Sequence, residues 1–296
     1  MSFVAAEIAT QPDLWVRATT LAAEPAVAAA LPGRGARVAV VGCGTSLYMA
    51  RAWAARREEL GYGETDAFPA SEFPAARRYD RVVALTRSGT TTEIVRLVSA
   101  LRGVTPTTVI TADASLPAGA AADSVVELAF ADEKSVVQTR FATTALALLR
   151  SAVGDPLDRA VADVRAELAR PVPAGYRDRR QFTFLGTGWT VGLAEEAGLK
   201  LRESAQAWAE AYPAMEYRHG PISVADEHAL VWVFGAAPEG LRAEIEQTAA
   251  TVITSAADPM AELVGAQRLA VELAERRGLD PDAPRNLTRS IVLTDS

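Results

Sequence analysis

A cluster of hydroxyl side chains around position 88 is the part of the chain best suited to bind an anion. The apolar run 82–85 before it is typical of a strand buried on both faces of a parallel sheet, and the apolar spacing over 94–101 predicts a helix after it. Between them lie Gly89 and the hydroxyl residues Thr86, Ser88, Thr90, Thr91 and Thr92. Hydroxyl donors, unpaired backbone N–H groups and the positive end of a helix dipole would meet here, which favours a phosphate.

The same segment narrows the choice of ligand. No lysine stands where a nucleotide triphosphate loop carries one, so a nucleotide triphosphate is not the obvious ligand. The alternative is a capping box, in which Thr90 bonds a backbone N–H of the first turn and Glu93 reaches back. Because capping needs one hydroxyl, it does not account for the others.

A second set of donors follows the first strand that we expect, over 37–41. That strand ends in the segment Gly42 to Ser46, and the helix expected over 47–60 comes next, which is the layout of a ligand-binding crossover. It is not the dinucleotide fingerprint, because Leu47 stands where the third glycine should be. We therefore predict that Thr45 and Ser46 lie near the same ligand. Cys43 is expected to be buried packing, because nothing nearby would lower the pKa of its thiol.

Carboxylates and a lysine in the second half of the chain could act on the carbon atoms of a ligand. Glu196, Lys200 and Glu203 share one face of a predicted helix, and Glu210, Tyr212, Glu216, Arg218 and His219 lie in a turn-rich stretch beyond it. One interpretation is a surface pair between Glu196 and Lys200, followed by an irregular loop. The other makes Glu203 a general base and His219 a titrating group near an open-chain sugar.

The elements that would position these residues alternate between strand and helix. Strands are expected over 65–68, 107–111 and 125–130, and a helix over 139–152. The strand, glycine turn and helix recur at 182–185 and beyond, and a further strand over 229–234 lacks the hydroxyl loop. This order predicts an α/β fold with two doubly wound, flavodoxin-like subdomains, whose parallel sheets are flanked by helices and bind ligands at their carboxyl edges.

Four parts of the chain are expected from this pattern. Residues 1–33 form a helical segment that could pack on either domain or on a second subunit, and 34–154 form the phosphate-binding subdomain. Residues 155–175 form a connecting helix and linker. Residues 176–296 form the second subdomain, which contains the catalytic helix, the loop and the C-terminal tail.

Composition excludes several classes of protein. The 296 residues are 49% hydrophobic and 23% charged, as in soluble globular proteins, and a net charge of −7 argues against nucleic acid as a partner. With one cysteine and two distant histidines, we predict no disulfide, no metal site and no cofactor. The first residues lack a signal-peptide pattern and no apolar run could cross a bilayer, so we expect no membrane partner and a cytoplasmic location.

Several stretches resemble the sugar isomerase (SIS) domain proteins. The likeness is greatest to the isomerase half of glucosamine-fructose-6-phosphate aminotransferase, to stand-alone amino-sugar-phosphate deaminase/isomerases and to fructosamine-6-phosphate deglycases. The matching stretches are VVGCGTS at 40–46, ASEF at 70–73, ALTRSGTTTE at 84–93, EKSVVQTRFATT at 133–144, EEAGLKLRE at 195–203, EAYPAMEYRHGP at 210–221 and PRNLTRSIVL at 284–293.

The resemblance implies roles for particular residues. The residues that it assigns to the sugar phosphate and its nearby hydroxyls are Thr45, Ser46, Thr86, Ser88 and Thr91. The residues that it places on a loop that touches the sugar are Val136, Val137 and Gln138. It makes Glu203 the carboxylate that moves a proton between C1 and C2. It makes His219 the ring-opening group, contributed by the neighbouring subunit of a homodimer. Glu196 and Lys200 would line the site, and we place Lys200 with the catalytic residues.

Three departures from the family pattern affect the predicted reaction. The glutaminase domain of the aminotransferase has no counterpart in this sequence, so we do not expect glutamine as the ammonia donor. Arg289 stands where the aminotransferase has an imine-forming lysine, and an arginine can orient oxygens but stays protonated. Arg87 and Gln138 replace other polar residues beside the sugar.

These residues lead to one main hypothesis and two alternatives. The main one is an isomerase or deaminase that acts on a ketose or amino-sugar 6-phosphate by ring opening and C1–C2 proton transfer. The first alternative is a fructosamine-6-phosphate deglycase. The second is a regulator that binds a phosphosugar without turnover, although the chain is acidic and shows no basic recognition helix.

Overall fold

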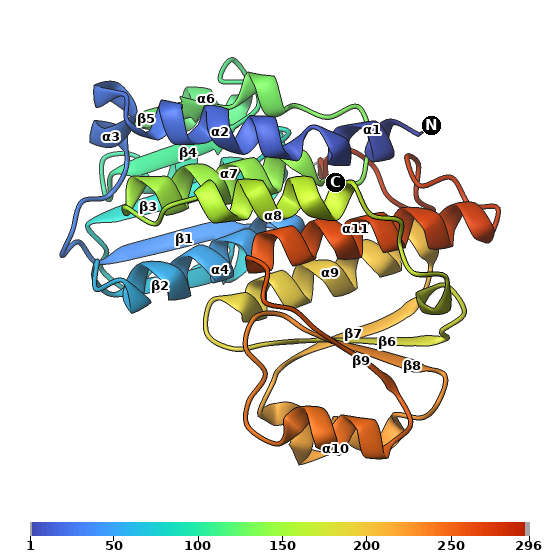
Figure 1. Ribbon diagram of the computed structural model, residues 1–296. Helices are drawn as coiled ribbons and strands as arrows, with labels where there is room; N and C mark the ends of the chain where they lie inside the picture. The colour runs from blue at the N-terminus through green and yellow to red at the C-terminus, as the bar shows by residue number, and fades with distance from the viewer. Residues whose placement is uncertain (1, 294–296) are drawn as a thin grey trace. The chain divides into compact units, whose positions relative to one another are not determined.

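The computed structural model describes residues 2–293, which form two compact units with one parallel sheet each (Figure 1). We call them the N-terminal-sheet unit and the C-terminal-sheet unit. Within the described residues, the N-terminal-sheet unit contains 13–134, 138–157 and the tail from 288, and the C-terminal-sheet unit contains the segment up to 12, 135–137 and 158–287. The predicted boundaries 34–154 and 176–296 stay a prediction.

The sheet of the N-terminal-sheet unit has five strands in the order β2-β1-β3-β4-β5, all parallel. They are β1 (Val38–Gly42), β2 (Thr65–Pro69), β3 (Arg81–Thr86), β4 (Thr107–Thr111) and β5 (Ser124–Glu127). This is the flavodoxin-like order, whose direction reverses between β1 and β3. The loops after these two strands therefore lie at the switch point, where open α/β sheets bind ligands.

Helices cover both faces of this sheet. They are α2 (Gln11–Ala22), α3 (Pro25–Ala30), α4 (Thr45–Glu59), α5 (Thr92–Leu101), α6 (Pro117–Ala121) and α7 (Arg140–Ala152). Ala39 and Val41 of β1 pack in one core cluster with Ile94 and Val98 of α5. Alternate strand residues face the other side, where α4 and α7 contact each other. The indole of Trp53 on α4 donates to the backbone oxygen of Leu149 on α7 at 3.0 Å, which joins the two helices.

The C-terminal-sheet unit repeats this plan with four parallel strands in the order β7-β6-β8-β9. They are β6 (Gln181–Gly186), β7 (Trp208–Pro213), β8 (Ala229–Val233) and β9 (Thr251–Thr254). Its helices are α1 (Phe3–Ala9), α8 (Asp158–Leu168), α9 (Thr190–Ala205), α10 (Leu241–Gln247) and α11 (Pro259–Arg276). In Figure 1, α9 and α11 lie side by side on one face of the sheet and α10 lies on the other.

Two sequence expectations about strands are wrong. The strand expected over 125–130 ends at Glu127, and its apolar continuation forms a short 3₁₀ helix, Ala129–Ala131. Glu210 and Tyr212 lie on strand β7 and not in a turn-rich loop, because the backbone of β7 pairs with β6 along its whole length. β7 is an edge strand, so charged side chains are tolerated on it.

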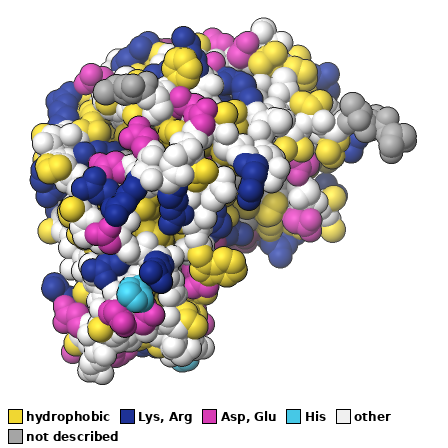
Figure 2. Space-filling model, turned by 90° about the vertical axis from the view of Figure 1, so that its right-hand side faces the viewer, with side chains coloured by type: hydrophobic (Ala, Val, Ile, Leu, Met, Phe, Trp, Pro, Cys, Tyr) yellow, Lys and Arg dark blue, Asp and Glu magenta, His cyan; other side chains and the backbone are white. Residues whose placement is uncertain are grey.

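Figure 2 shows one face of the molecule, on which basic and acidic side chains are interspersed. Among residues 2–293, no helix combines the length and the apolar character that a bilayer span requires.

Candidate functional site

The hydroxyl loop joins β3 to α5 at the switch point of the first sheet. Gly89 takes a φ of +63°, and a Cβ there would lie 2.8 Å from the Cβ of Leu116. Only glycine fits both conditions, so this position fixes the course of the loop. Helix α5 begins at Thr92 with Thr91 as its N-cap residue, and no side chain caps it. The alternative capping box of Thr90 and Glu93 is therefore wrong.

Substitution of Gly89 provides a stability test of this loop. We expect Gly89→Ala to lower the free energy of unfolding by about 2–4 kcal/mol, since the left-handed conformation and the contact with Leu116 both oppose a side chain. Gly103→Ala is the matched control, because Gly103 has a φ of +74° but open space around its would-be Cβ. Gly103→Ala should lower the free energy of unfolding by about 1–2 kcal/mol. Equal losses in chemical denaturation would show that the contact at Gly89 is unimportant.

The hydroxyls of this loop converge on one point. That point is occupied by the Ser290 hydroxyl of the C-terminal tail, which lies 2.9 Å from Thr90 Oγ1, 3.1 Å from Ser88 Oγ and 3.4 Å from Thr91 Oγ1. Beside it, the backbone N–H of Thr92 donates to Ile291 O at 3.1 Å. Three side-chain hydroxyls and a helix N-terminal N–H thus share one small region, as an anion site requires.

A cavity of about 20 Å³ lies beside this point, and most of the predicted binding residues line it. Its lining residues are Cys43, Ser46, Leu85, Thr86, Arg87, Ser88, Thr91, Ile94, Gln138 and Arg289. The side-chain oxygen of Gln138 is buried without a hydrogen-bond partner among the described residues, so it is available to a ligand donor. Thr45 is buried in the first turn of α4 but does not line this cavity. Val136 belongs to the other unit, where its N–H donates to Asp282 O.

Cys43 contributes a thiol to the cavity wall. Burial, together with the nearby Glu93 carboxylate, raises the pKa of Cys43 to about 11. The Cys43 Sγ lies 3.7 Å from Glu93 Oε2, as a donor to the carboxylate. The thiol is therefore protonated at neutral pH, which suits packing and not nucleophilic chemistry.

Arg87 and Glu133 form a buried charge pair that the sequence did not reveal. Their side chains are 1% and 0% exposed, and Arg87 Nη1 lies 3.9 Å from Glu133 Oε2. The Glu133 carboxylate also accepts backbone N–H groups at the start of α7, from Thr139 at 2.6 Å and Arg140 at 2.9 Å. The spacing of six residues from Glu133 to Thr139 does not match a capping box, so pattern reasoning missed it.

The tail is held over the loop by Arg289. Its guanidinium donates to the Asp132 carboxylate at 2.5 Å and to the Glu133 backbone oxygen. Its own backbone oxygen accepts from Arg87 Nη2 at 3.0 Å. Arg289 therefore anchors the tail through its side chain and its backbone.

The predicted catalytic helix is α9, in the C-terminal-sheet unit. Lys200 Nζ lies 2.5 Å from Glu203 Oε2 and 3.4 Å from Glu196 Oε1. The side chains of Glu196 and Lys200 are each 1% exposed, whereas that of Glu203 is 18% exposed. The interpretation of Glu196 and Lys200 as a surface pair is wrong, because α9 packs against its sheet and against α11, which buries both side chains. Glu203 is the accessible carboxylate of the three residues.

His219 lies in the 3₁₀ turn Glu216–His219 of the same unit and is exposed. Its side chain makes no hydrogen bond or ion pair with any residue between 2 and 293. The neighbouring Arg218 is instead tied to Glu244 on α10, at 2.7 Å and 2.9 Å. The structure thus leaves His219 accessible and does not join it to Glu203. The described residues also contain no group of three or more His, Cys, Asp or Glu side chains that could hold a metal ion.

Solved structures with the same architecture define the class of fold. Glucosamine-6-phosphate deaminase from Thermotoga maritima aligns over 99% of this chain and 100% of its own, with a TM-score of 0.79 and 24% identity. Tagatose-6-phosphate ketose/aldose isomerase from Escherichia coli aligns over 99% and 96%, with a TM-score of 0.80 and 19% identity. The chain therefore has the α/β fold of the SIS-type phosphosugar isomerases, as predicted.

Sequence comparison adds a more particular relationship, although no family model matches the chain. Glutamine–fructose-6-phosphate aminotransferase (isomerizing) from Gloeobacter violaceus is 33% identical over 156 residues, which is 43% of this chain and 25% of that protein. The protein of the same name from Methanothermobacter thermautotrophicus is 25% identical over 88% of this chain and 52% of its own length. The chain thus spans about half or less of these relatives. It is homologous to their isomerase region, which confirms the predicted resemblance.

Proposed function

We propose that the protein is an enzyme that binds a sugar 6-phosphate and moves a proton between C1 and C2 of its open chain. The observation that carries this proposal is the convergence of the Ser88, Thr90 and Thr91 hydroxyls on one point at the switch of a flavodoxin-like sheet. The homology to aminotransferases that are named for isomerisation supports the sugar phosphate as ligand. The reaction is an aldose–ketose isomerisation or an amino-sugar-phosphate deamination.

Each proposed catalytic residue has a chemical task. His219, supplied by the neighbouring subunit of a homodimer, opens the sugar ring by moving a proton between the ring oxygen and the anomeric hydroxyl. Glu203 then removes the proton from one of the carbons C1 and C2 and returns it to the other through an enediol. Lys200, 2.5 Å from Glu203, holds the carboxylate in place. Residues such as Ser46, Thr86, Arg87 and Gln138 surround the phosphate and its nearby oxygens, with Arg289 closing the site.

Deamination adds one hydrolytic step to the same sequence. When C2 carries an amine, proton transfer from C2 to C1 converts the amino aldose into a ketimine. Water then adds to C2, ammonia leaves and a ketose phosphate remains. If the substrate is instead a ketose phosphate that carries an amino acid, the reaction would be a deglycation.

The cytoplasmic location and the homodimer are also parts of this proposal.

Turnover of a small panel of sugars tests the proposal. The panel is fructose-6-phosphate, tagatose-6-phosphate, glucosamine-6-phosphate, galactosamine-6-phosphate and a fructosamine-6-phosphate, with ammonia and ketose measured separately. We expect conversion of at least one of them, and the product identifies the reaction. A raised melting temperature without conversion would indicate the phosphosugar-binding regulator instead. Neither binding nor conversion would reject the proposal.

The tail serine gives a separate prediction about the phosphate. Because the Ser290 hydroxyl occupies the point where the loop hydroxyls converge, a phosphate has to displace it. We expect Ser290→Ala to tighten the binding of inorganic phosphate by about fivefold, because a hydrogen bond contributes roughly 0.5–1.5 kcal/mol net. Calorimetric titration measures this change.

Thr288→Ala is the matched control for this titration. Among residues 2–293, its hydroxyl bonds only to the backbone oxygen of Ser290 and not to the hydroxyl loop, so phosphate affinity should stay unchanged. Weaker phosphate binding in Ser290→Ala would mean that the tail serine is a phosphate ligand and not a competitor.

A further inference from the structure

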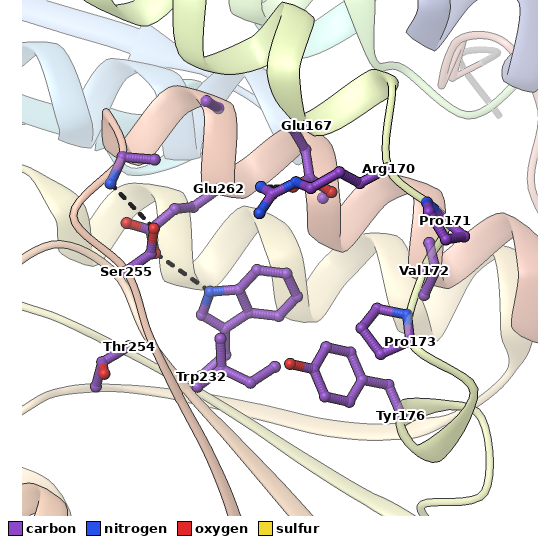
Figure 3. A pocket seen from close by; sticks show the side chains of 14 residues that line it. Glu167, Arg170, Pro171, Val172, Pro173, Tyr176, Trp232, Thr254, Ser255 and Glu262 are labelled. Carbon is purple, nitrogen blue, oxygen red and sulfur yellow. Dashed lines mark hydrogen bonds and ion pairs between the residues drawn. The ribbon is translucent and has the colours of Figure 1, made fainter.

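A second cavity, of about 250 Å³, lies entirely within the C-terminal-sheet unit and shares no residue with the hydroxyl-lined cavity. The linker after α8, the strands β8 and β9, and helix α11 form its walls (Figure 3). Figure 3 shows the ring of Trp232 between the carboxyl group of Glu262 and the ring of Tyr176. The cavity therefore combines aromatic surfaces with an acidic group, and none of its residues has a role in the proposed reaction.

Glu262 is a buried carboxyl group whose donors carry no charge. Its side chain is 4% exposed. One oxygen accepts from the indole N–H of Trp232 at 3.2 Å and the other from the backbone N–H of Gly235 at 3.4 Å. Among residues 2–293, no lysine, arginine or histidine forms an ion pair with it. Burial raises the pKa of Glu262 to about 8, so the carboxyl group is mostly protonated at neutral pH and becomes an unpaired negative charge when it ionises.

The other charged groups around the cavity are already engaged. Both carboxylate oxygens of Glu167 on α8 accept from guanidinium groups, of Arg170 at 2.7 Å and of Arg268 at 3.0 Å. Asp258 accepts the backbone N–H of Met260 as the N-cap of α11. These two acids add to the negative potential at Glu262, since both raise its pKa. Because Arg170 and Arg268 are paired with Glu167, the ionised form of Glu262 is the group here that would attract a cation.

Aromatic rings form the side of the cavity next to Glu262. The ring centroids of Tyr176 and Trp232 lie 6.4 Å apart, and Phe234 stacks against Trp232 at 5.9 Å. Gly265 on α11 leaves room for this arrangement, because a Cβ there would lie 3.1 Å from both Trp232 and Glu167. The Tyr176 hydroxyl has no hydrogen-bond partner among the described residues. Aromatic faces beside a carboxylate are the usual surroundings of a bound ammonium group.

We propose that this cavity binds a small organic cation, whose ammonium group pairs with the Glu262 carboxylate while its apolar body contacts Trp232 and Tyr176. The ligand supplies the counter-charge that the protein lacks at this position. The inference goes beyond the proposed function and does not depend on it, because it concerns other residues and another ligand charge.

Choline and its uncharged analogue 3,3-dimethylbutan-1-ol test this proposal with the full chain. The two probes have nearly the same shape, and choline cannot lose its charge with pH. We expect choline to shift the indole N–H signal of Trp232 in an NMR titration and the analogue to bind at least about tenfold more weakly. Because Glu262 must lose its proton, choline affinity should rise about tenfold per pH unit up to the pKa of about 8 and then level off.

Two substitutions at the cavity and one control decide the outcome. Glu262→Gln keeps an acceptor for the Trp232 N–H, and we expect it to weaken choline binding at least tenfold and to remove the pH dependence. Tyr176→Leu leaves the carboxyl group in place and should weaken the binding of choline severalfold. Glu246→Gln, at an exposed position of α10, should change neither the affinity for choline nor its pH dependence. Equal binding of both probes, unchanged binding in Glu262→Gln, or no binding of choline at all would overturn the proposal.

Discussion

Glu203→Gln is expected to reduce turnover of the sugar phosphate by about 10²- to 10⁴-fold, which is the usual contribution of a general base. The amide has nearly the same shape and can still accept a hydrogen bond from Lys200, so the fold and the binding of the phosphate should be retained. KM should therefore change little while kcat falls. Steady-state kinetics on the sugar that the panel identifies measure both quantities.

Glu227→Gln is the matched control for Glu203→Gln. Glu227→Gln changes an exposed carboxylate whose side chain is 70% accessible, and it should leave kcat and KM unchanged. Unchanged kcat in Glu203→Gln would refute the assigned base, even if the protein converts the sugar. The carboxylate of another residue would then have to move the proton.

Glu133→Ala is expected to lower the free energy of unfolding by about 3–5 kcal/mol, the typical cost of removing one partner of a buried ion pair. The substitution removes the Glu133 carboxylate, which lies 3.9 Å from the Arg87 guanidinium, a group that is 1% exposed. It also removes the acceptor for the N–H groups of Thr139 and Arg140 at the start of α7. Chemical denaturation of both proteins measures the loss.

Two further variants separate these effects of Glu133. Glu133→Gln keeps an acceptor for the N–H groups but removes the charge, so its free energy of unfolding should fall by less than that of Glu133→Ala. Glu127→Ala is the control, because that exposed carboxylate accepts, within the described part of the chain, only the Ala114 N–H at the surface. A loss below about 1 kcal/mol in Glu133→Ala would show that the pair with Arg87 contributes little.

The fold could be predicted from the sequence where buried parallel strands appear as apolar runs. Strand β4 matches its predicted range, Thr107–Thr111, because every residue in it is buried and both ends are marked by polar turns. Strand β7 was missed, since this edge strand carries an exposed Trp208 and a half-buried Glu210 and has no apolar run to detect. Strand β5 was made too long, because apolar residues continue into the 3₁₀ helix that follows.

The candidate site could be predicted only as far as local spacing reaches. The hydroxyl loop and the shared face of Glu196, Lys200 and Glu203 follow from helix and strand periods. Burial of Glu196 and Lys200 does not, because it is set by the packing of α9 against α11. Ser290 meets Ser88 across 202 positions of sequence, and no local pattern predicts such a contact.

The central proposal is that the hydroxyl loop binds the phosphate of the substrate and that a Glu203 carboxylate moves the proton between C1 and C2. A crystal structure of the protein with the bound sugar phosphate tests it most directly. We expect the phosphate oxygens at hydrogen-bond distance from the hydroxyls of Ser88 and Thr91, with C1 and C2 within reach of a Glu203 carboxylate. A phosphate held elsewhere, or a bound sugar whose C1 and C2 no Glu203 side chain approaches, would contradict the account.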